Sequence, residues 1–304
     1  MDCQQHEKQL TALISGEIRL NEPMTKHTTW KIGGPADIVA LPGSIQDVCI
    51  LVRYAKNAGL PLTVLGNGSN LLVRDGGIRG LVVKLGSQLS KVEFLPDLRV
   101  QAQAGVLLPR LAKLFCQHGL TGLEFAAGIP ATLGGAVVMN AGAHGGEISQ
   151  LVETVMTVDS QGSLIEIPGR ELEFHYRESK LQGTDSIVVE VTLQAQPGVP
   201  EEIAGRIEGN LTKRKQAQPH GWPNAGSVFR NPPENSAGRL IEEAGLKGIK
   251  VGGAMVSEKH ANFIINTGNA SARDILTLIE MVREQVQSHS SLLLVPEVRI
   301  VGED

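Results

Sequence analysis

The sequence predicts an α+β protein built from two or three lobes. With 304 residues the chain is long enough to bury more than one core. Its first part alternates strand, helix and strand patterns, and its middle part reads as strands joined by hairpin turns. The last part differs in composition, with a proline- and glycine-rich loop between helical segments. These observations predict separate lobes of mixed secondary structure.

Composition and charge exclude several classes of function. The 41% hydrophobic and 20% charged content is typical of a soluble globular protein. A net charge of -4 and 3% aromatic residues suit neither general nucleic-acid binding nor base stacking. No apolar run approaches the roughly 20 residues of a membrane span, and no signal peptide is evident. The three cysteines and eight histidines show no disulfide or metal-ligand spacing, so we expect a cytoplasmic protein without a metal.

Periodicity and turn signals predict the elements in order. Short apolar runs predict strands over residues 36–41, 62–65, 71–73, 98–104, 186–195 and 292–301, and a hairpin over 151–167 with its turn at 160–162. Helical spacing and capping patterns predict helices over the first 20 residues, from 44 to 59, near 109–115, through 213–215, from 236 and from 271. Residues 196–200 are expected to form a linker. The strand at 62–65 belongs to a β-α-β unit and ends in a glycine turn, where α/β sheets usually bind ligands.

Two glycine-rich stretches are the most informative feature of the chain. Residues 66–70 read Gly-Asn-Gly-Ser-Asn, and residues 128–135 read Gly-Ile-Pro-Ala-Thr-Leu-Gly-Gly. Such turns leave main-chain N–H groups unpaired and let the backbone approach a ligand, although neither has the spacing of a dinucleotide fingerprint or a P-loop. With Asn70 and Asn140 beside them, the turns favour opposite walls of a cleft for a diphosphate cofactor, whereas each alone would also fit a tight turn. The basic run 213–215 suits a diphosphate, but a solvated helix face looks the same.

Three polar residues are candidates for chemistry. Ser227 lies in a turn of small residues and is either a turn former or a proton donor to a carbanion or enolate. It lacks a nucleophile-elbow motif and an evident histidine base, which argues against a hydrolase. Arg177 either clamps a carboxylate with two hydrogen bonds or pairs on the surface with Glu173 or Glu178. Glu297 lies in an apolar run that we expect to be a buried strand, so its carboxylate is either paired structurally or functional.

Further motifs follow in a specific order along nearly the whole chain. They are Thr-Thr-Trp-Lys-Ile-Gly-Gly-Pro-Ala at 28–36, Met-Asn-Ala-Gly-Ala at 139–143, Tyr-Arg-Glu-Ser at 176–179, Ala-Gly-Ser-Val-Phe-Arg-Asn-Pro at 225–232 and Pro-Glu-Val at 296–298. Together with both glycine turns, they resemble the UDP-N-acetylenolpyruvoylglucosamine reductase family. The resemblance implies a two-lobed, vanillyl-alcohol-oxidase-like fold that binds FAD non-covalently, followed by a substrate domain. The implied domains are an N-terminal helical segment at 1–32, an FAD domain at 33–198 with lobes at about 33–85 and 86–198, and a substrate domain at 205–304 whose last strand returns to the active site.

The resemblance also implies an activity and a set of site residues. The activity is the NADPH-dependent reduction of UDP-N-acetylglucosamine enolpyruvate to UDP-N-acetylmuramate through FAD, in bacterial peptidoglycan synthesis. By position, Ser227 matches the family's proton donor, and Arg177 and Glu297 match its other two active-site residues. The implied substrate contacts are Lys215, Arg230 and Asn231. The implied cofactor contacts are Gly66, Asn67, Gly68, Ser69, Asn70, Leu71, Gly128, Ile129, Pro130, Thr132, Gly134, Gly135, Asn140, Ala141 and Gly142.

The chain departs from the family's pattern in places, and other functions stay open. Few residues separate Ser179 from the strand at Ile187, which matches a shorter class without the insertion that carries a substrate-covering tyrosine. His144 and Val295 stand where a tyrosine and an acidic residue are common. One alternative is another FAD-dependent oxidase or dehydrogenase acting on an alcohol or hydroxy acid, and another is a non-enzymatic nucleotide-binding module. We expect a monomer whose partners are the UDP-sugar and NADPH, with neither nucleic acid nor membrane.

Overall fold

The computed structural model describes residues 2–304 of the chain, which forms two compact units. Unit 1 consists of Met1–Leu20, Ile38–Asn67 and Gly80–Lys213, and unit 2 of Asn21–Asp37, Gly68–Arg79 and Arg214–Asp304. Each unit is therefore assembled from segments that are far apart in sequence. The mixture of helices, antiparallel sheets and parallel strand pairs confirms the predicted α+β class.

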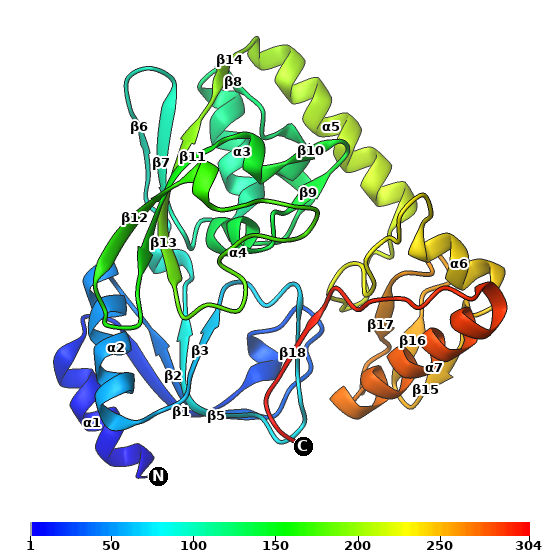
Figure 1. Ribbon diagram of the computed structural model, residues 1–304, viewed down its shortest axis with the longest axis horizontal. Helices are drawn as coiled ribbons and strands as arrows, with labels where there is room; N and C mark the ends of the chain where they lie inside the picture. The colour runs from blue at the N-terminus through cyan, green and yellow to red at the C-terminus, as the bar shows by residue number, and fades with distance from the viewer. Residues whose placement is uncertain (1) are drawn as a thin grey trace. The chain divides into compact units, whose positions relative to one another are not determined.

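The largest sheet of unit 1 has five antiparallel strands in the order β12-β11-β13-β7-β6 (Figure 1). The strands are β6 (Val92–Phe94), β7 (Arg99–Gln103), β11 (Val152–Val158), β12 (Leu164–Pro168) and β13 (Ile187–Gln194). Helix α4 (Leu133–Val138) packs against β13 and β7, and helix α3 (Leu108–Gln117) buries Leu111 and Phe115 in the same core. The predicted hairpin is confirmed, because β11 and β12 are joined by a turn in which Gly162 N donates to Asp159 O at 2.9 Å.

A second sheet has four strands in the order β1-β2-β5-β3. Its elements are β1 (Glu17–Pro23), β2 (Pro35–Leu41), β3 (Leu62–Leu65) and β5 (Ile78–Lys84), with helices α1 (Cys3–Leu13) and α2 (Ile45–Ala58). Helix α2 begins as predicted, since the Ser44 hydroxyl accepts a hydrogen bond from Asp47 N, and it ends at Gly59 with φ +64°. Because β3 pairs in parallel with β5, the predicted β-α-β unit has β5 inserted between its two strands.

The prediction of one helix over the first 20 residues is wrong. Helix α1 ends at Leu13, and strand β1 starts at Glu17. Ile18 and Leu20 both pack against the core, and their spacing of two residues is the period at which side chains share one face of a strand. Between the two elements, Gly16 approaches Leu41 O so closely that a side chain there would collide with it.

The remaining elements of unit 1 are short, apart from one long helix. They are β8 (Leu120–Thr121), β9 (Gly142–Ala143), β10 (Gly146–Glu147), β14 (Gln196–Pro197), the 3₁₀ helices η2 (Ser87–Leu89), η3 (Glu124–Gly128), η4 (Ile148–Gln150) and η5 (Gly169–Glu171), and helix α5 (Pro200–Ala217), whose last residues belong to unit 2. The predicted linker at 196–200 is largely wrong, because β14 pairs with β8 and α5 already starts at Pro200. Within residues 2–304, no helix combines the length and apolar character that crossing a bilayer requires.

Unit 2 is built around a three-stranded antiparallel sheet and two helices. Its elements are the 3₁₀ helix η1 (Met24–Lys26), β4 (Leu71–Val73), helix α6 (Ala237–Glu243), β15 (Lys250–Val251), β16 (Ala254–Val256), β17 (Ile264–Asn266), helix α7 (Ala272–Ser290) and β18 (Arg299–Val301). Both helices start at the predicted serine caps, Ser236 and Ser271. Trp30 is fully buried in this core and its indole N–H donates to Ile264 O at 2.8 Å.

The predicted strand at 292–301 is correct only at its end. Residues 299–301 form β18, which pairs in parallel with β4. Of the apolar residues before it, Leu293 and Val295 are more than half exposed, whereas Leu294 and Val298 are buried. The run therefore lies along the surface as an extended loop, and it does not form a buried strand.

Candidate active site

The two predicted glycine stretches contact each other within unit 1. Asn67 Nδ2 donates a hydrogen bond to Pro130 O at 2.6 Å. A Cβ atom on Gly66 would collide with the hydroxyl of Thr132, so only glycine fits at that position. At this end the two stretches are therefore neighbours.

The first stretch offers a row of main-chain donors. In the described part of the chain, the N–H groups of residues 67–70 donate to no protein acceptor. Gly68 has φ +64°, and a Cβ there would collide with His27 O. Gly68 O accepts a hydrogen bond from Thr29 N at 3.2 Å, which holds the turn in this shape. Successive unbonded N–H groups attract an anion, so the turn fits the phosphates of a dinucleotide.

Two main-chain N–H groups of the second stretch donate hydrogen bonds to other parts of the protein. Leu133 N donates to Val106 O at 2.8 Å, and Gly134 N donates to Ala104 O at 2.9 Å. A Cβ on Gly134 would lie 2.8 Å from the Ala104 Cβ, so this glycine permits close packing of two chain segments. The expectation of unpaired N–H groups therefore holds for the first stretch and fails for these two residues of the second.

Arg177 is held by the loop that follows the second stretch. Its Nη2 donates to Gly142 O at 2.7 Å, and its Nη1 lies 3.5 Å from Asn140 O. The Asn140 side chain is fully buried and donates to His175 O at 2.9 Å while accepting from Ser149 N at 3.2 Å. Asn140 thus fastens the 175–178 turn to its own loop, and its side chain serves protein structure.

The backbone of Arg177 is strained, and its guanidinium lies near an aromatic ring. Its φ of +58° lies in the left-handed region, which disfavours any residue with a side chain and is common at functional sites. The guanidinium lies 5.0 Å from the centre of the Tyr176 ring. Glu173, one of the two surface partners considered, pairs instead with Lys180 at 2.9 Å.

Unit 2 brings Ser227 and Glu297 together. Glu297 N donates to Val228 O at 2.7 Å, and Phe229 forms a β-bridge with Pro296. Ser227 is half-buried, and its hydroxyl bonds to none of the described residues. Glu297 is also half-buried, so the expectation that it sits in a fully buried strand is wrong.

The predicted substrate contacts differ in exposure and in their hydrogen bonds within the protein. Lys215 is exposed near the end of α5, and its amine pairs with none of the residues in the described range. Asn231 Oδ1 accepts from Ala237 N at 3.0 Å at the start of α6, which leaves its amide nitrogen for other partners. Arg230 N donates to Val295 O at 2.9 Å. Beside Lys215, burial lowers the pKa of the Arg214 guanidinium.

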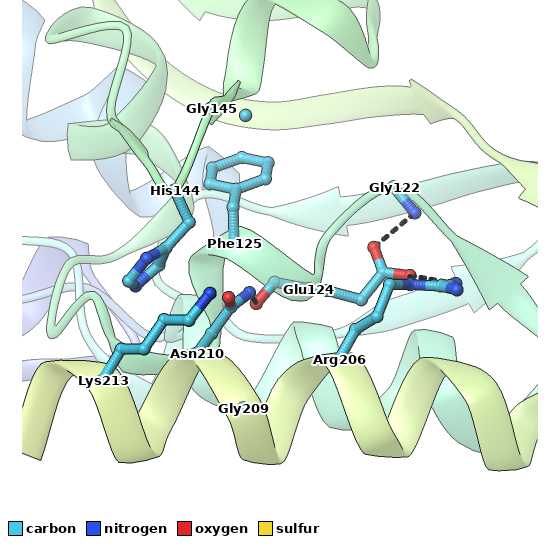
Figure 2. Close-up of a pocket in the computed structure, with 10 residues that line it drawn as sticks. Gly122, Glu124, Phe125, His144, Gly145, Arg206, Gly209, Asn210 and Lys213 are labelled. Atoms are coloured by element: carbon cyan, nitrogen blue, oxygen red, sulfur yellow. Dashed lines mark hydrogen bonds and ion pairs between the residues drawn. The ribbon is translucent and has the colours of Figure 1, made fainter.

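A cavity of about 410 Å³ in unit 1 was not predicted from the sequence. Figure 2 shows Arg206, Asn210 and Lys213 rising from α5 towards Phe125 and Glu124. Its other lining residues are Gly122, His144, Gly145, Gly146 and Gly209, and none of the predicted site residues is among them. The one signal in the sequence was His144, which departs from the family's tyrosine.

The acidic group of this cavity, Glu124, forms an ion pair with Arg206. Glu124 Oε1 lies 2.7 Å from Arg206 Nη2, and Glu124 Oε2 accepts from Gly122 N at 2.8 Å. Burial raises the pKa of the Glu124 carboxyl, but hydrogen bonds from Thr121, Arg206 and Gly122 outweigh it and hold this pKa below its usual value. The amine of Lys213 then gives the cavity a positive charge.

Comparison with known proteins shows what the chain is similar to. The family model of the FAD binding domain matches residues 36–168, and that of the UDP-N-acetylenolpyruvoylglucosamine reductase C-terminal domain matches residues 218–301. The UDP-N-acetylenolpyruvoylglucosamine reductase of Heliobacterium modesticaldum is 49% identical over 97% of this chain and 94% of its own length. That of Carboxydothermus hydrogenoformans is 45% identical over 100% of both chains.

Solved structures agree in fold. The crystal structure of UDP-N-acetylenolpyruvylglucosamine reductase from Thermus caldophilus matches with a TM-score of 0.81 and 38% identity, over 94% of this chain and 99% of that one. Alkyldihydroxyacetonephosphate synthase matches with a TM-score of 0.51 and 14% identity, over 98% of this chain and 61% of that one, which indicates a shared fold alone.

Proposed function

The chain belongs to the UDP-N-acetylenolpyruvoylglucosamine reductase family, and we propose that Arg177, Ser227 and Glu297 are its catalytic residues. It is an FAD-dependent oxidoreductase that reduces UDP-N-acetylglucosamine enolpyruvate to UDP-N-acetylmuramate with NADPH, in peptidoglycan synthesis. Bound FAD supplies the hydride, which it takes from NADPH. The residues of the chain must then bind both partners and manage the charge and the proton that hydride transfer requires.

The turn at 66–70 is our candidate for the diphosphate of FAD. Its support is the row of four main-chain N–H groups that have no acceptor in the described residues. Residues 128–135 contribute by packing against Gly66 and Asn67, and Asn140 contributes by shaping the loop with Ala141 and Gly142. We assign residues 33–198 to flavin binding and 205–304 to the substrate.

Protonation is the step that these residues explain best. Hydride added to the terminal carbon of the enolpyruvyl group leaves negative charge on the neighbouring carbon, which its carboxylate delocalises. That carbon needs a proton, and Ser227 is our candidate for the donor. The observation that carries this assignment is a half-buried hydroxyl with no described protein partner, held beside Glu297 by the 2.7 Å bond between Glu297 N and Val228 O.

Arg177 and Glu297 complete the proposed chemistry. The Arg177 guanidinium, anchored on Gly142 O, stabilises the charge that develops on the substrate carboxylate. An ionised Glu297 alone would repel that charge, so we assign it a protonated or cation-paired form.

The substrate contacts rest on charge and accessibility. Lys215 presents an exposed amine to the diphosphate of the UDP-sugar. Arg230 and Asn231 follow Ser227 on the same segment, and Asn231 keeps its amide nitrogen for a ligand. Because UDP-sugars and NADPH are intracellular metabolites, we also propose a cytoplasmic location. We further propose a monomer, which size-exclusion chromatography would test.

The deciding experiment compares acceptors for the reduced flavin. The enzyme is reduced anaerobically with NADPH and mixed with UDP-N-acetylglucosamine enolpyruvate, or with the oxidised forms of simple alcohols and hydroxy acids. Rapid reoxidation by the enolpyruvyl compound alone is expected. Faster reoxidation by a ketone or keto acid would favour the alternative dehydrogenase function.

A further inference from the structure

The main-chain N–H and C=O of Phe229 are both bonded to a side chain instead of a neighbouring strand. Asn262 Oδ1 accepts from Phe229 N at 2.9 Å, and Asn262 Nδ2 donates to Phe229 O at 2.8 Å. Asn262 is only 3% exposed, so these bonds form away from water. Its own carbonyl oxygen also accepts from Val228 N at 2.8 Å. One asparagine therefore binds three of the four main-chain polar groups of Val228 and Phe229, the two residues directly after Ser227.

The opposite edge of the same segment is held by the loop of Glu297. Val228 O accepts from Glu297 N, and Arg230 N donates to Val295 O at 2.9 Å. The side chains of Val228 and Phe229 are almost fully buried in the core of unit 2. The segment thus has partners on both edges and in the core, and Asn262 is the partner on one whole edge.

We propose that Asn262 is a positioning residue for protonation, an inference that rests on the proposed role of Ser227. The Ser227 hydroxyl has no hydrogen bond to the described residues, so the main chain that follows it determines where it points. A displacement of about 1 Å at a reacting group can slow a reaction by about 10²-fold. Only a side chain that both accepts and donates can bind the N–H and the C=O of one residue, which asparagine does and alanine does not.

Asn266 provides a matched control for a merely structural role. It lies four positions further on, is 4% exposed, and its Nδ2 donates to Trp30 O at 3.0 Å. Its Oδ1 accepts from Gly268 N at 2.9 Å and from Ala270 N at 3.1 Å. The two asparagines thus match in burial, and their side chains form two and three hydrogen bonds, but the side chain of Asn266 has no bond to the segment of Ser227.

The test measures both half-reactions in three flavin-loaded variants, Asn262→Ala, Asn266→Ala and Ser227→Ala. In Asn262→Ala, NADPH should reduce the flavin at the normal rate. Reoxidation of that flavin by the enolpyruvyl substrate should be about 10- to 100-fold slower than in the wild type. Its solvent deuterium isotope effect on reoxidation should rise, because proton transfer becomes rate-limiting. Asn266→Ala should lower the melting temperature similarly and reoxidise within about 2-fold of the wild type.

Asn262→Asp gives a second readout that folding alone does not produce. A protonated aspartic acid can accept from Phe229 N and donate to Phe229 O, as asparagine does, whereas the ionised form can only accept. Burial raises the pKa of such a carboxyl. Reoxidation by Asn262→Asp should therefore approach the wild-type rate at low pH and fall behind it as pH rises, which decides the matter even if Asn262→Ala does not fold.

The outcomes separate this inference from the proposed function. If Ser227→Ala is slow in reoxidation but Asn262→Ala and Asn262→Asp match the wild type at every pH, Asn262 has no positioning role. Equal losses in Asn262→Ala and Asn266→Ala would also overturn it. If Ser227→Ala itself reoxidises normally, the assignment of Ser227 fails first, whatever Asn262 does.

Discussion

Glu297 N donates a hydrogen bond to Val228 O at 2.7 Å, and this bond ties the candidate carboxyl to the segment of the candidate proton donor. Both residues belong to unit 2, so their proximity is a property of one compact unit. Arg177 belongs to unit 1, where the loop of Asn140 and Gly142 holds it. Each unit therefore fixes its own candidate residues through contacts inside that unit.

Ser227→Ala should separate the two half-reactions. Reduction of the flavin by NADPH should be unchanged, and reoxidation by substrate should slow about 10²- to 10⁴-fold, the usual range for a lost general acid. Stopped-flow flavin absorbance measures both steps. Ser160→Ala, in an exposed hairpin turn, should change neither. An equal loss in both half-reactions would mean that Ser227 acts in binding or structure.

Arg177→Lys should slow substrate reduction about 10-fold or more. The planar guanidinium reaches Gly142 O and the nearby Asn140 O while keeping a fixed orientation, which a single ammonium does not reproduce. Both side chains carry a Cβ, so the left-handed backbone is equally strained in the variant. Single-turnover reoxidation measures the effect, with the exposed Arg170→Lys as control. A near-normal rate would remove Arg177 from the mechanism.

Lys215→Ala should raise the KM for the UDP-sugar about 10-fold with little change in kcat. A charged hydrogen bond to a ligand contributes about 1.5 kcal/mol, which corresponds to about 10-fold in affinity. The exposed amine of Lys215 bonds to none of the described residues, so its removal breaks no contact within the protein. Steady-state kinetics with varied substrate measure it, and Lys113→Ala on α3 serves as the exposed control. An unaltered KM would count against a contact with the diphosphate.

Gly68→Ala should release FAD. The left-handed φ of +64° and the collision of a new Cβ with His27 O would both distort the turn that carries the unbonded N–H groups. The flavin-to-protein absorbance ratio after purification measures the loss. Gly86→Ala is the control, because a Cβ there meets nothing within 4 Å and its φ is -122°. Full flavin content in Gly68→Ala would contradict the assignment of this turn.

Glu124→Gln should destabilise the protein in a pH-dependent way. Its pKa lies below the usual value despite burial, because Thr121, Arg206 and Gly122 donate to the carboxylate. The ionised group therefore stabilises the folded state above its unfolded pKa of about 4.3, and this stabilisation is lost as pH falls through the folded pKa. We expect a loss of about 2 kcal/mol at neutral pH.

Urea unfolding of Glu124→Gln against the wild type, from about pH 7 down to about pH 3, would follow the effect. The difference in unfolding free energy should shrink as pH falls. Glu93→Gln, an exposed residue that pairs with Lys91 at 3.0 Å, should show little difference at any pH. A difference that stays constant with pH would mean that the ionised carboxylate is not what stabilises this site.

Much of the local structure was predictable because its cause is local. The Ser44 cap, the left-handed Gly59 and the hairpin turn at Gly162 all depend on residues within a few positions of one another. The sheet of unit 2 was missed, since strands of two or three residues such as β15 and β16 are too short to show a period. The loop at 292–298 was taken for a strand because apolar content alone does not tell which side chains reach a core.

The sequence by itself determined the family, the glycine turn at 66–70 and the chemical groups available at Arg177, Ser227 and Glu297. Only the tertiary structure decided which groups remain for a ligand. It leaves the N–H groups of the first turn without a protein acceptor, whereas those of Leu133 and Gly134 donate to main-chain oxygens of unit 1. The side chains of Asn140 and Asn262 bond to the main chain of other segments and hold them in place. The physical reason is that a hydrogen bond joins whatever donor and acceptor the packed chain brings within about 3 Å, and these partners lie far apart in sequence.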